Sequence, residues 1–369
     1  MLTVALDATP LVGDRTGIGV AVSGMVRSLA SLGELDLVGY GLTAAGWRRV
    51  RAALPAGVRP SRGPMPAGVL LSAWSRFSFP AIEIWTGPVD VVHGTNFVVP
   101  PARRASRIVS VWDLTSVRYP EMCTATARRY PELVRKALEQ GAWVHTGSHF
   151  VAEEIASEFS LERDRILVIP PGVTATVRAA DAGPGRGSRP YILTIGTVEP
   201  RKDVPGVVKA FDAIAAEHPD LELWIAGPEG WGEQQLSEAV SVATHRDRIR
   251  RLGWVPDAGA VLAGAALLAY PSLYEGFGFP PLEAMAAGVP VVATAAGSLP
   301  EVTGEAALLV PPGDTDALGA AMSKVLGDSG LRDSLVERGR ARVATFSWKT
   351  SARRLSEGYQ RVAAAWGIA

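Results

Sequence analysis

Two carboxylates stand on either side of a short run of Gly, Phe and Pro in the stretch SLYEGFGFPPLEAM. They are Glu275 and Glu283, and seven residues separate them. A carboxylate accepts hydrogen bonds from neighbouring hydroxyls, and such charge-assisted bonds are about twice as strong as neutral ones. Gly276 and Gly278 allow backbone N–H groups to approach a ligand closely. The stretch therefore predicts a site for a polyhydroxylated ligand, although a helix-capping Glu283 and a solvated Glu275 are the ordinary alternative.

The flanking pattern places this stretch in a loop between a strand and a helix. Ala265 to Pro271 is an apolar run that predicts a strand, and Pro281 followed by LEAMAAG predicts a helix that ends near Gly288. Glu283 then lies in the first turn of that helix. Ligands of open α/β sheets bind beyond the carboxyl ends of the strands, so we expect both carboxylates to face a cleft between two domains.

Strand and helix patterns alternate along the whole chain of 369 residues, which exceeds what one hydrophobic core usually organises. Apolar runs such as TVALDA, VDVVHG, PYILTIGT and VPVVATA alternate with helical segments, as in parallel sheets covered by helices. We predict an N-terminal domain over residues 1–177, a Gly-, Pro- and Ser-rich linker over 178–190 and a C-terminal domain over 191–345. The tail, residues 346–369, predicts a helix that packs across both domains.

Charge and cysteine content exclude several classes of function. Lys+Arg and Asp+Glu both total 37, so no net charge draws the chain to nucleic acid or to an anionic membrane. The single cysteine, Cys123, excludes an intrachain disulfide and fits a reducing cytosol. The N-terminus lacks the basic segment of a signal peptide, and the longest uncharged apolar stretch is too short to span a bilayer. These features favour a soluble cytoplasmic protein.

The segment EGFGFPPLE resembles the E-x7-E signature of the retaining glycosyltransferases of family 4. Other segments follow in that family's order and extend the likeness over nearly the whole chain: GIGVAVSGMVRSL, VHGTNFVVPP, VWDLTSVRYPE, VIPPGV, ILTIGTVEPRKD, LWIAGPEGW, LGWVPD, GVPVVATAAGSLPEV and FSWKTSA. The resemblance implies the GT-B fold, in which two Rossmann-like, doubly wound parallel-sheet domains face a cleft. It also implies a retaining, metal-independent hexosyltransferase without a cofactor.

The substrates implied by this resemblance are a nucleotide diphosphate sugar and an acceptor hydroxyl. Mannose is the expected hexose and GDP-mannose the expected donor, with a UDP-hexose also possible. The acceptor would be a glycan, a glycolipid or a small molecule, and a glycolipid acceptor would bring the enzyme into transient contact with a membrane surface. The sequence leaves the acceptor open, because the segment around Arg48 to Met65 matches no pattern that we can interpret.

The resemblance also implies roles for individual residues of the C-terminal half. Glu275 would contact hydroxyls of the donor sugar, Glu283 would hold the ribose, and Arg201 with Lys202 would bind the diphosphate. Further donor contacts are expected in the same loop and helix from Gly276, Phe277, Gly278, Phe279 and Leu282. Gly227 and Val255 would line the pocket for the base.

In the N-terminal half, the loop GDRTGIG resembles one that brings backbone N–H groups to the donor phosphates or the acceptor, which implicates Gly17 and Gly19. One segment departs from the family, because Trp112 precedes Asp113 where relatives usually carry a histidine that approaches the donor sugar. His93 or Asp113 is a candidate for that polar contact, and Trp112 either stacks on a sugar or fills space.

Three alternatives accompany this interpretation. The missing histidine raises the possibility of a non-catalytic GT-B-like subunit that binds a sugar nucleotide or a partner. A nucleotide-sugar epimerase of the same fold is a further alternative that would need its own acid and base. Asp314 and Asp316 form a D-x-D sequence that holds a metal in another glycosyltransferase class, but its position before ALGAAMSKVL favours a helix N-cap.

Overall fold

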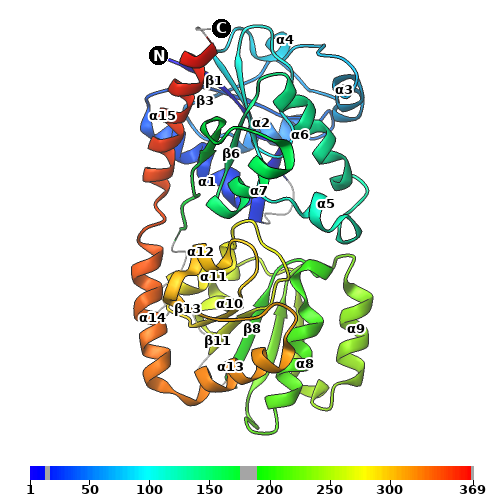
Figure 1. The fold of residues 1–369 in the computed structure, drawn as a ribbon, viewed down its shortest axis with the longest axis vertical. Coiled ribbons are helices and arrows are strands. Elements are labelled where there is room, and N and C mark those ends of the chain that lie inside the picture. Colours follow the sequence, from blue (N-terminus) through cyan, green and yellow to red (C-terminus); the bar gives the residue numbers. More distant parts are fainter. Residues whose placement is uncertain (13–16, 175–188, 367–369) are drawn as a thin grey trace. The chain divides into compact units, whose positions relative to one another are not determined.

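The structure is a computed structural model, and it describes residues 1–12, 17–174 and 189–366 (Figure 1). The chain divides into two units, of which the first contains Met1–Gly172 and Phe346–Ala369 and the second contains Val173–Thr345. Most of the expected linker lies outside the described residues. Each unit is built around its own parallel sheet.

The first unit contains a seven-stranded sheet in the order β3-β2-β1-β4-β5-β6-β7, and every strand pair in it is parallel. Helices cover both faces of such a sheet, which explains why its strands are nearly continuous apolar runs. The register pairs Leu6 of β1 with His93 of β4. The strands are β1 (Thr3–Asp7), β2 (Asp36–Tyr40), β3 (Val58–Pro60), β4 (Val91–Gly94), β5 (Ser106–Ser110), β6 (Trp143–Thr146) and β7 (Ile166–Val168).

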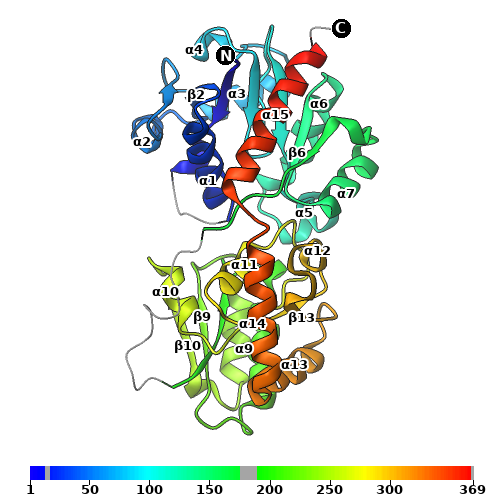
Figure 2. The ribbon, with the colours of Figure 1, turned by 90° about the vertical axis from the view of Figure 1, so that its left-hand side faces the viewer.

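The helices of the first unit include the C-terminal helix α15 (Trp348–Trp366), which lies beside α1 (Figure 2). It also contacts β4 and β5, and the hydroxyl of Ser106 donates a 3.0 Å hydrogen bond to the carbonyl of Val362. Our expectation that this helix packs across both domains stays a prediction. The other helices are η1 (Thr9–Leu11), α1 (Gly17–Leu32), α2 (Trp47–Ala53), α3 (Ala67–Trp74), α4 (Glu83–Thr86), α5 (Thr115–Arg118), η2 (Pro120–Met122), η3 (Ala127–Arg129), α6 (Tyr130–Glu139), α7 (His149–Phe159) and η4 (Arg163–Arg165).

The second unit contains a six-stranded parallel sheet in the order β10-β9-β8-β11-β12-β13. Its central strands β8 and β11 pair through Leu267 and Ile192, which are both fully buried. The strands are β8 (Tyr191–Ile195), β9 (Glu222–Ala226), β10 (Ile249–Gly253), β11 (Leu267–Tyr270), β12 (Val291–Thr294) and β13 (Ala307–Val310).

Helices α8, α9 and α13 share one hydrophobic core with the strands of the second sheet (Figure 1). The expected D-x-D segment is a helix cap, because the carboxylate of Asp314 accepts a 2.9 Å hydrogen bond from the backbone N–H of Ala317. No helix within the described ranges is both long and apolar enough to cross a bilayer. The helices are η5 (Pro200–Lys202), α8 (Val204–Ile214), α9 (Glu233–Val242), η6 (Arg246–Arg248), α10 (Ala258–Ala263), α11 (Phe279–Ala286), α12 (Leu299–Thr303), η7 (Gly304–Ala306), α13 (Thr315–Gly327) and α14 (Ser329–Val343).

Candidate active site

The second sheet has a topological switch point between β8 and β11. The chain leaves β8 toward β9 on one side and leaves β11 toward β12 on the other, so the loops after these two strands diverge. Ligands of open α/β sheets bind in the crevice that such divergence creates. The loop after β8 carries Arg201 and Lys202, and the loop after β11 carries Glu275. The topology therefore brings the three residues to one edge of one sheet.

The loop after β8 is held in place by its own turn and by its neighbour. Pro200 opens the short helix η5, and Asp203 adopts a left-handed backbone with φ of 45°. The carboxylate of Asp203 accepts a 3.2 Å hydrogen bond from the N–H of Gly206 and so caps helix α8. The two switch-point loops are joined directly, because the N–H of Leu273 donates to the carbonyl of Arg201 at 2.8 Å.

Arg201, Lys202 and Glu275 form one buried cluster of charges. The Lys202 ammonium lies 2.5 Å from Oε1 of Glu275, and Nη1 of Arg201 lies 3.0 Å from its Oε2. The Tyr270 hydroxyl donates to the same Oε1 at 2.9 Å, and Nη2 of Arg201 lies 2.6 Å from the Glu199 carboxylate. All four charged side chains are 15% exposed or less. The two cations are thus paired with two carboxylates.

Burial and charge act in opposite directions on these groups. Burial raises the pKa of Glu275, but the charges of Arg201 and Lys202 outweigh it and lower that pKa to about 2. Burial lowers the pKa of Lys202, although Glu275 acts to raise it. Glu275 is therefore a carboxylate at any physiological pH, and it accepts hydrogen bonds without donating any.

The backbone after Glu275 approaches its surroundings closely. Gly278 has a φ of 97°, and a Cβ atom there would lie 2.6 Å from Leu299, so both conformation and space require glycine. A Cβ atom on Gly297 would lie 2.2 Å from the carbonyl oxygen of Glu275, and the N–H of Ser298 donates to that oxygen at 2.8 Å. The loop before α12 thus supports the loop that carries Glu275. Gly297 stands in a segment that we matched to the family, but we gave it no role.

Helix α11 begins earlier than the sequence pattern predicts. It starts at Phe279 with Gly278 as its N-cap, so Pro280 and Pro281 both lie in the first turn, where a missing N–H has no cost. Glu283 consequently lies in the second turn and not in the first. Burial raises the pKa of Glu283, and no charged side chain in the described part of the chain pairs with it. The roles of Gly276, Phe277, Phe279 and Leu282 in donor binding stay predictions.

The residues expected to line the base pocket follow two neighbouring strands of the same sheet. Gly227 comes directly after β9, and its N–H donates to the carbonyl of Gly253 at 2.8 Å. Val255 follows β10 by two residues. Both stand at the carboxyl edge, as a ligand contact requires, and the assignment itself stays a prediction.

His93 lies in the interior of the first unit, within β4. It has no exposed surface, and its two ring nitrogens lie 2.8 Å from the hydroxyls of Tyr359 and Ser110. The Ser110 hydroxyl also lies 2.8 Å from Nδ1 of His145, whose Nε2 lies 3.2 Å from the carbonyl oxygen of Ile169. This placement favours a structural role for His93 over a contact with the donor sugar.

Only one arrangement of protons satisfies this chain of side chains. The carbonyl of Ile169 can only accept a hydrogen bond, so Nε2 of His145 donates to it and Nδ1 of His145 accepts from the Ser110 hydroxyl. The Ser110 hydroxyl accepts from Nε2 of His93, and Nδ1 of His93 accepts from the Tyr359 hydroxyl. Burial lowers the pKa of His93 well below its usual value and that of His145 to about 4, so both rings are neutral. The chain connects α15 to the first sheet.

Trp112 and Asp113 follow β5 and have local partners. Trp112 is 6% exposed, and its indole N–H donates to the carbonyl of Thr95 at 2.9 Å, which favours packing over stacking on a sugar. Asp113 accepts a 2.9 Å hydrogen bond from the N–H of Thr115 at the start of α5. Gly17 and Gly19 form the first turn of α1, and the rest of their predicted loop, residues 13–16, lies outside the described residues.

The first sheet has its own switch point, between β1 and β4, and sequence reasoning missed the polar groups there. Asp7 ends β1, and burial raises its pKa to about 6 against the hydrogen bonds that it accepts from Thr9. Asn96 follows β4, and its buried Oδ1 has no hydrogen-bond partner among the residues that the structure describes. Phe97 has a left-handed φ of 58°, an unfavourable conformation for a bulky residue, and stacks on Tyr130. The sequence signal that could have identified these polar groups is Asp7, a carboxylate at the end of an apolar run.

Comparison with known proteins agrees with this geometry. Residues 180–342 match the family described as glycosyl transferases group 1, and residues 16–172 match the glycosyl transferase 4-like domain. The O-antigen chain mannosyltransferase B of Escherichia coli is 33% identical over 288 residues, which cover 73% of this chain and 74% of that protein. The chain belongs to the family 4 glycosyltransferases.

A further relative agrees with this family 4 assignment, and a solved structure agrees with the fold. An MMP alpha-(1->4)-mannosyltransferase of Mycolicibacterium hassiacum is 32% identical over 67% of this chain and 58% of its own length. A solved Anabaena structure in complex with UDP and glucose has a TM-score of 0.75 and 17% identity, and the match covers 98% of this chain and 100% of that one. That likeness shows the fold, and with the two parallel sheets it confirms the expected GT-B architecture. Nothing in these comparisons favours a non-catalytic subunit or an epimerase.

Proposed function

We propose that this glycosyltransferase transfers mannose from GDP-mannose to a hydroxyl of a glycan, glycolipid or small-molecule acceptor, with retention of the anomeric configuration and without a metal. Two relatives that are at least 30% identical over two thirds of this chain have names that describe mannosyltransferases, and this supports the choice of hexose. A cytoplasmic location is part of the proposal and rests on the sequence alone.

The observation that carries the proposal is the pairing of Arg201 and Lys202 with Glu275 at the switch point. A diphosphate carries more negative charge than one carboxylate. When the donor binds, the two cations would therefore pair with its diphosphate in place of Glu275. Arginine binds two phosphate oxygens with its planar fork, and lysine adds a point charge. Glu275 would then be free to accept hydrogen bonds from hydroxyls of the donor sugar.

In this reaction the bond from C1 of the sugar to the phosphate oxygen breaks, and a bond from C1 to the acceptor oxygen forms on the same face. The proton of the acceptor hydroxyl passes to the departing phosphate. Negative charge builds on the diphosphate, and preorganised donors such as Arg201 and Lys202 would stabilise it. The role of Glu275 in this scheme is to orient the sugar by its hydroxyls.

A panel of nucleotide sugars tests the donor by thermal shift, and NMR of the product tests the stereochemistry. We expect GDP-mannose to raise the melting temperature more than UDP-glucose, UDP-galactose or GDP-glucose, and the product to be the α-anomer. Stabilisation by UDP-hexoses alone would refute the donor assignment. A β-linked product would refute retention.

A further inference from the structure

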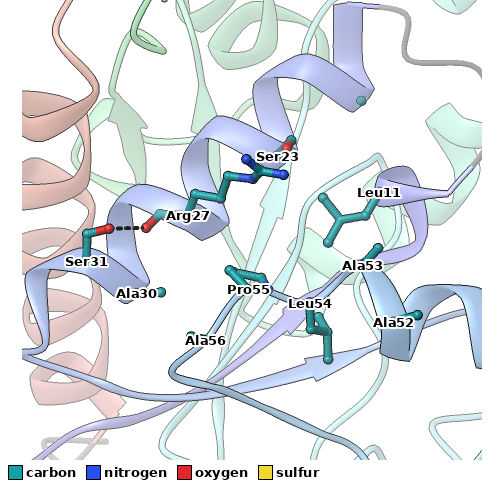
Figure 3. A pocket seen from close by; sticks show the side chains of 11 residues that line it. Leu11, Ser23, Arg27, Ala30, Ser31, Ala52, Ala53, Leu54, Pro55 and Ala56 are labelled. Atoms are coloured by element: carbon teal, nitrogen blue, oxygen red, sulfur yellow. Dashed lines mark hydrogen bonds between the residues drawn. The ribbon is translucent and has the colours of Figure 1, made fainter.

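The first unit contains a pocket of about 610 Å³ between helix α1 and the segment that ends helix α2 (Figure 3). Small residues on both walls explain why it is hollow, since little of their own volume projects into it. Among the described lining residues, only Arg27 has a long side chain. The lining residues are Leu11, Gly19, Ser23, Arg27, Ala30, Ser31, Ala52, Ala53, Leu54, Pro55 and Ala56.

Helix α1 has one face in the core of the first unit and another face at the pocket. One face buries Ala21, Val22, Met25, Val26 and Leu29 in the core of the unit. The other faces the pocket and carries the polar groups of Ser23 and Arg27. In Figure 3 the guanidinium of Arg27 lies beside Ser23 and on the side of the helix that faces Pro55 and Leu11.

Positive charge around this pocket is uncompensated within the described residues. Arg27 is exposed and has no ion pair there, and the lining contains no acidic side chain. Arg48 and Arg49 are also exposed, and each lies one helical turn before a lining alanine, Ala52 or Ala53, on the same face of α2. The overall charge of the chain is zero, so this excess is local.

One end of the pocket lies at the carboxyl edge of the first sheet. Leu11 ends helix η1, which follows β1 after a single residue, and Gly19 belongs to the first turn of α1. Strand β1 is one of the two strands at the switch point of this sheet. A ligand whose hydroxyl is held at that switch point can therefore extend along α1 into the pocket.

We propose that this pocket binds a phosphate group of the acceptor, so that the enzyme takes phosphorylated acceptors in preference to neutral ones. The inference rests on the proposed function and names the class of its second substrate. Arg27 and Ser23 supply a fork of N–H donors and a hydroxyl for the phosphate oxygens. The positive charges of Arg27, Arg48 and Arg49 favour a phosphate, which carries two negative charges, over a carboxylate, which carries one. The walls of Ala, Leu and Pro contact whatever the phosphate is attached to.

Isothermal titration calorimetry in saturating GDP tests this inference, because GDP keeps phosphate probes away from the donor site. The probes are octyl α-mannoside, α-mannose 1-phosphate and the octyl ester of α-mannose 1-phosphate. We expect the ester to bind at least tenfold more tightly than the neutral mannoside. Arg27→Gln should weaken binding of the ester by roughly 10- to 100-fold, as expected for loss of a charged hydrogen bond.

Arg104→Gln is the matched control, since Arg104 is an exposed arginine of the same unit that lies before β5, at the amino edge of the sheet. Its ester affinity should stay within about twofold of the wild type, as expected for a surface substitution away from the site. Equal affinity of the wild type for ester and mannoside, or equal affinity of both variants for the ester, would overturn the inference. Tight binding of the soluble phosphate as well shows that phosphate alone is recognised, whereas binding of the ester alone shows that the apolar walls hold a lipid tail.

Two independent measurements separate this inference from the proposed function. Thermal shift with GDP-mannose tests the donor site of the second unit, and the expected rise in melting temperature is not seen if the donor assignment is wrong. Calorimetry with the mannosyl probes tests the pocket, and the expected difference in affinity between ester and mannoside is not seen if the phosphate assignment is wrong. Initial rates with the phosphorylated and neutral acceptors should follow the same order as the affinities, with a ratio that falls at least tenfold in Arg27→Gln and is retained in Arg104→Gln.

Discussion

Replacing Glu275 with glutamine removes one charge from a cluster in which two cations are balanced by two carboxylates. The substitution keeps the shape of the side chain and leaves Arg201 and Lys202 buried, with the Glu199 carboxylate still 2.6 Å from Arg201. Breaking a buried ion pair in this way costs about 3 to 5 kcal/mol. The pKa gives a second estimate, since a fall from 4.5 to about 2 corresponds to roughly 3 kcal/mol of stabilisation at neutral pH.

The two estimates agree, so we expect Glu275→Gln to lower the free energy of unfolding by about 3 kcal/mol at pH 7 in urea. The folded-state pKa of Glu275 lies below its unfolded value, so this stabilisation is fully present above pH 4.5 and is lost as the pH falls toward 2. The difference between wild type and variant should shrink over that same range.

The affinity for GDP should not fall with the free energy of unfolding in this variant. The variant has one carboxylate fewer to balance its two cations, so GDP should bind to it at least as tightly as to the wild type, while turnover falls because the sugar is no longer oriented. Calorimetry and steady-state kinetics measure both effects. Equal stability of the two proteins at pH 7, or loss of GDP binding in Glu275→Gln, would refute the reasoning.

Three further predictions follow from the same geometry. Arg201→Ala should lower kcat roughly 100- to 1000-fold while activity survives excess EDTA; transfer that EDTA abolishes and manganese restores, with Arg201→Ala near wild type, would contradict the role of this residue. Glu283→Gln should weaken donor binding by roughly 10- to 100-fold in calorimetry and change kcat less, and an unchanged Kd would remove Glu283 from the donor site. Tyr359→Phe should cost about 1 to 3 kcal/mol in urea unfolding, because Nδ1 of His93 loses its donor, whereas Tyr40→Phe loses only a long 3.4 Å bond and should cost less; equal costs would argue against the proton arrangement in this chain.

Local sequence patterns predicted the elements of the fold, because their physical causes are local. Apolar runs became strands, and the proline and glycine positions placed α11 correctly to within two residues. The shift of its start arose because two consecutive prolines fit in one first turn, so the helix extends back to Phe279. The order of the strands, which creates both switch points, has no comparable local signal.

Side-chain partners were harder to predict because they are distant in sequence. Lys202 and Glu275 are 73 positions apart, and His93 and Tyr359 are 266 positions apart. The sequence predicted that Glu275 and Lys202 would both bind the donor, but it did not predict that they would pair with each other. A histidine that ends an apolar run gives no sign of a tyrosine on the C-terminal helix. Such pairs depend on the tertiary fold, and the pattern around each residue contains no information about them.

The chemistry at the two switch points differs in a way that matches the two substrates of the proposed reaction. The switch point of the second sheet presents Arg201 and Lys202, whose positive charges suit the negative charge of a diphosphate. The switch point of the first sheet presents the carboxyl group of Asp7 and the amide oxygen of Asn96, which has no partner in the described part of the chain; both groups accept hydrogen bonds from hydroxyls and repel phosphate. A phosphate carried by the acceptor must therefore lie away from Asp7, and helix α1 offers Arg27 in the pocket, which has no ion pair among the described residues. The signs of the charges thus agree with the proposed sites: the donor diphosphate at the second unit, the acceptor hydroxyl at the first switch point and an acceptor phosphate in the pocket beside it.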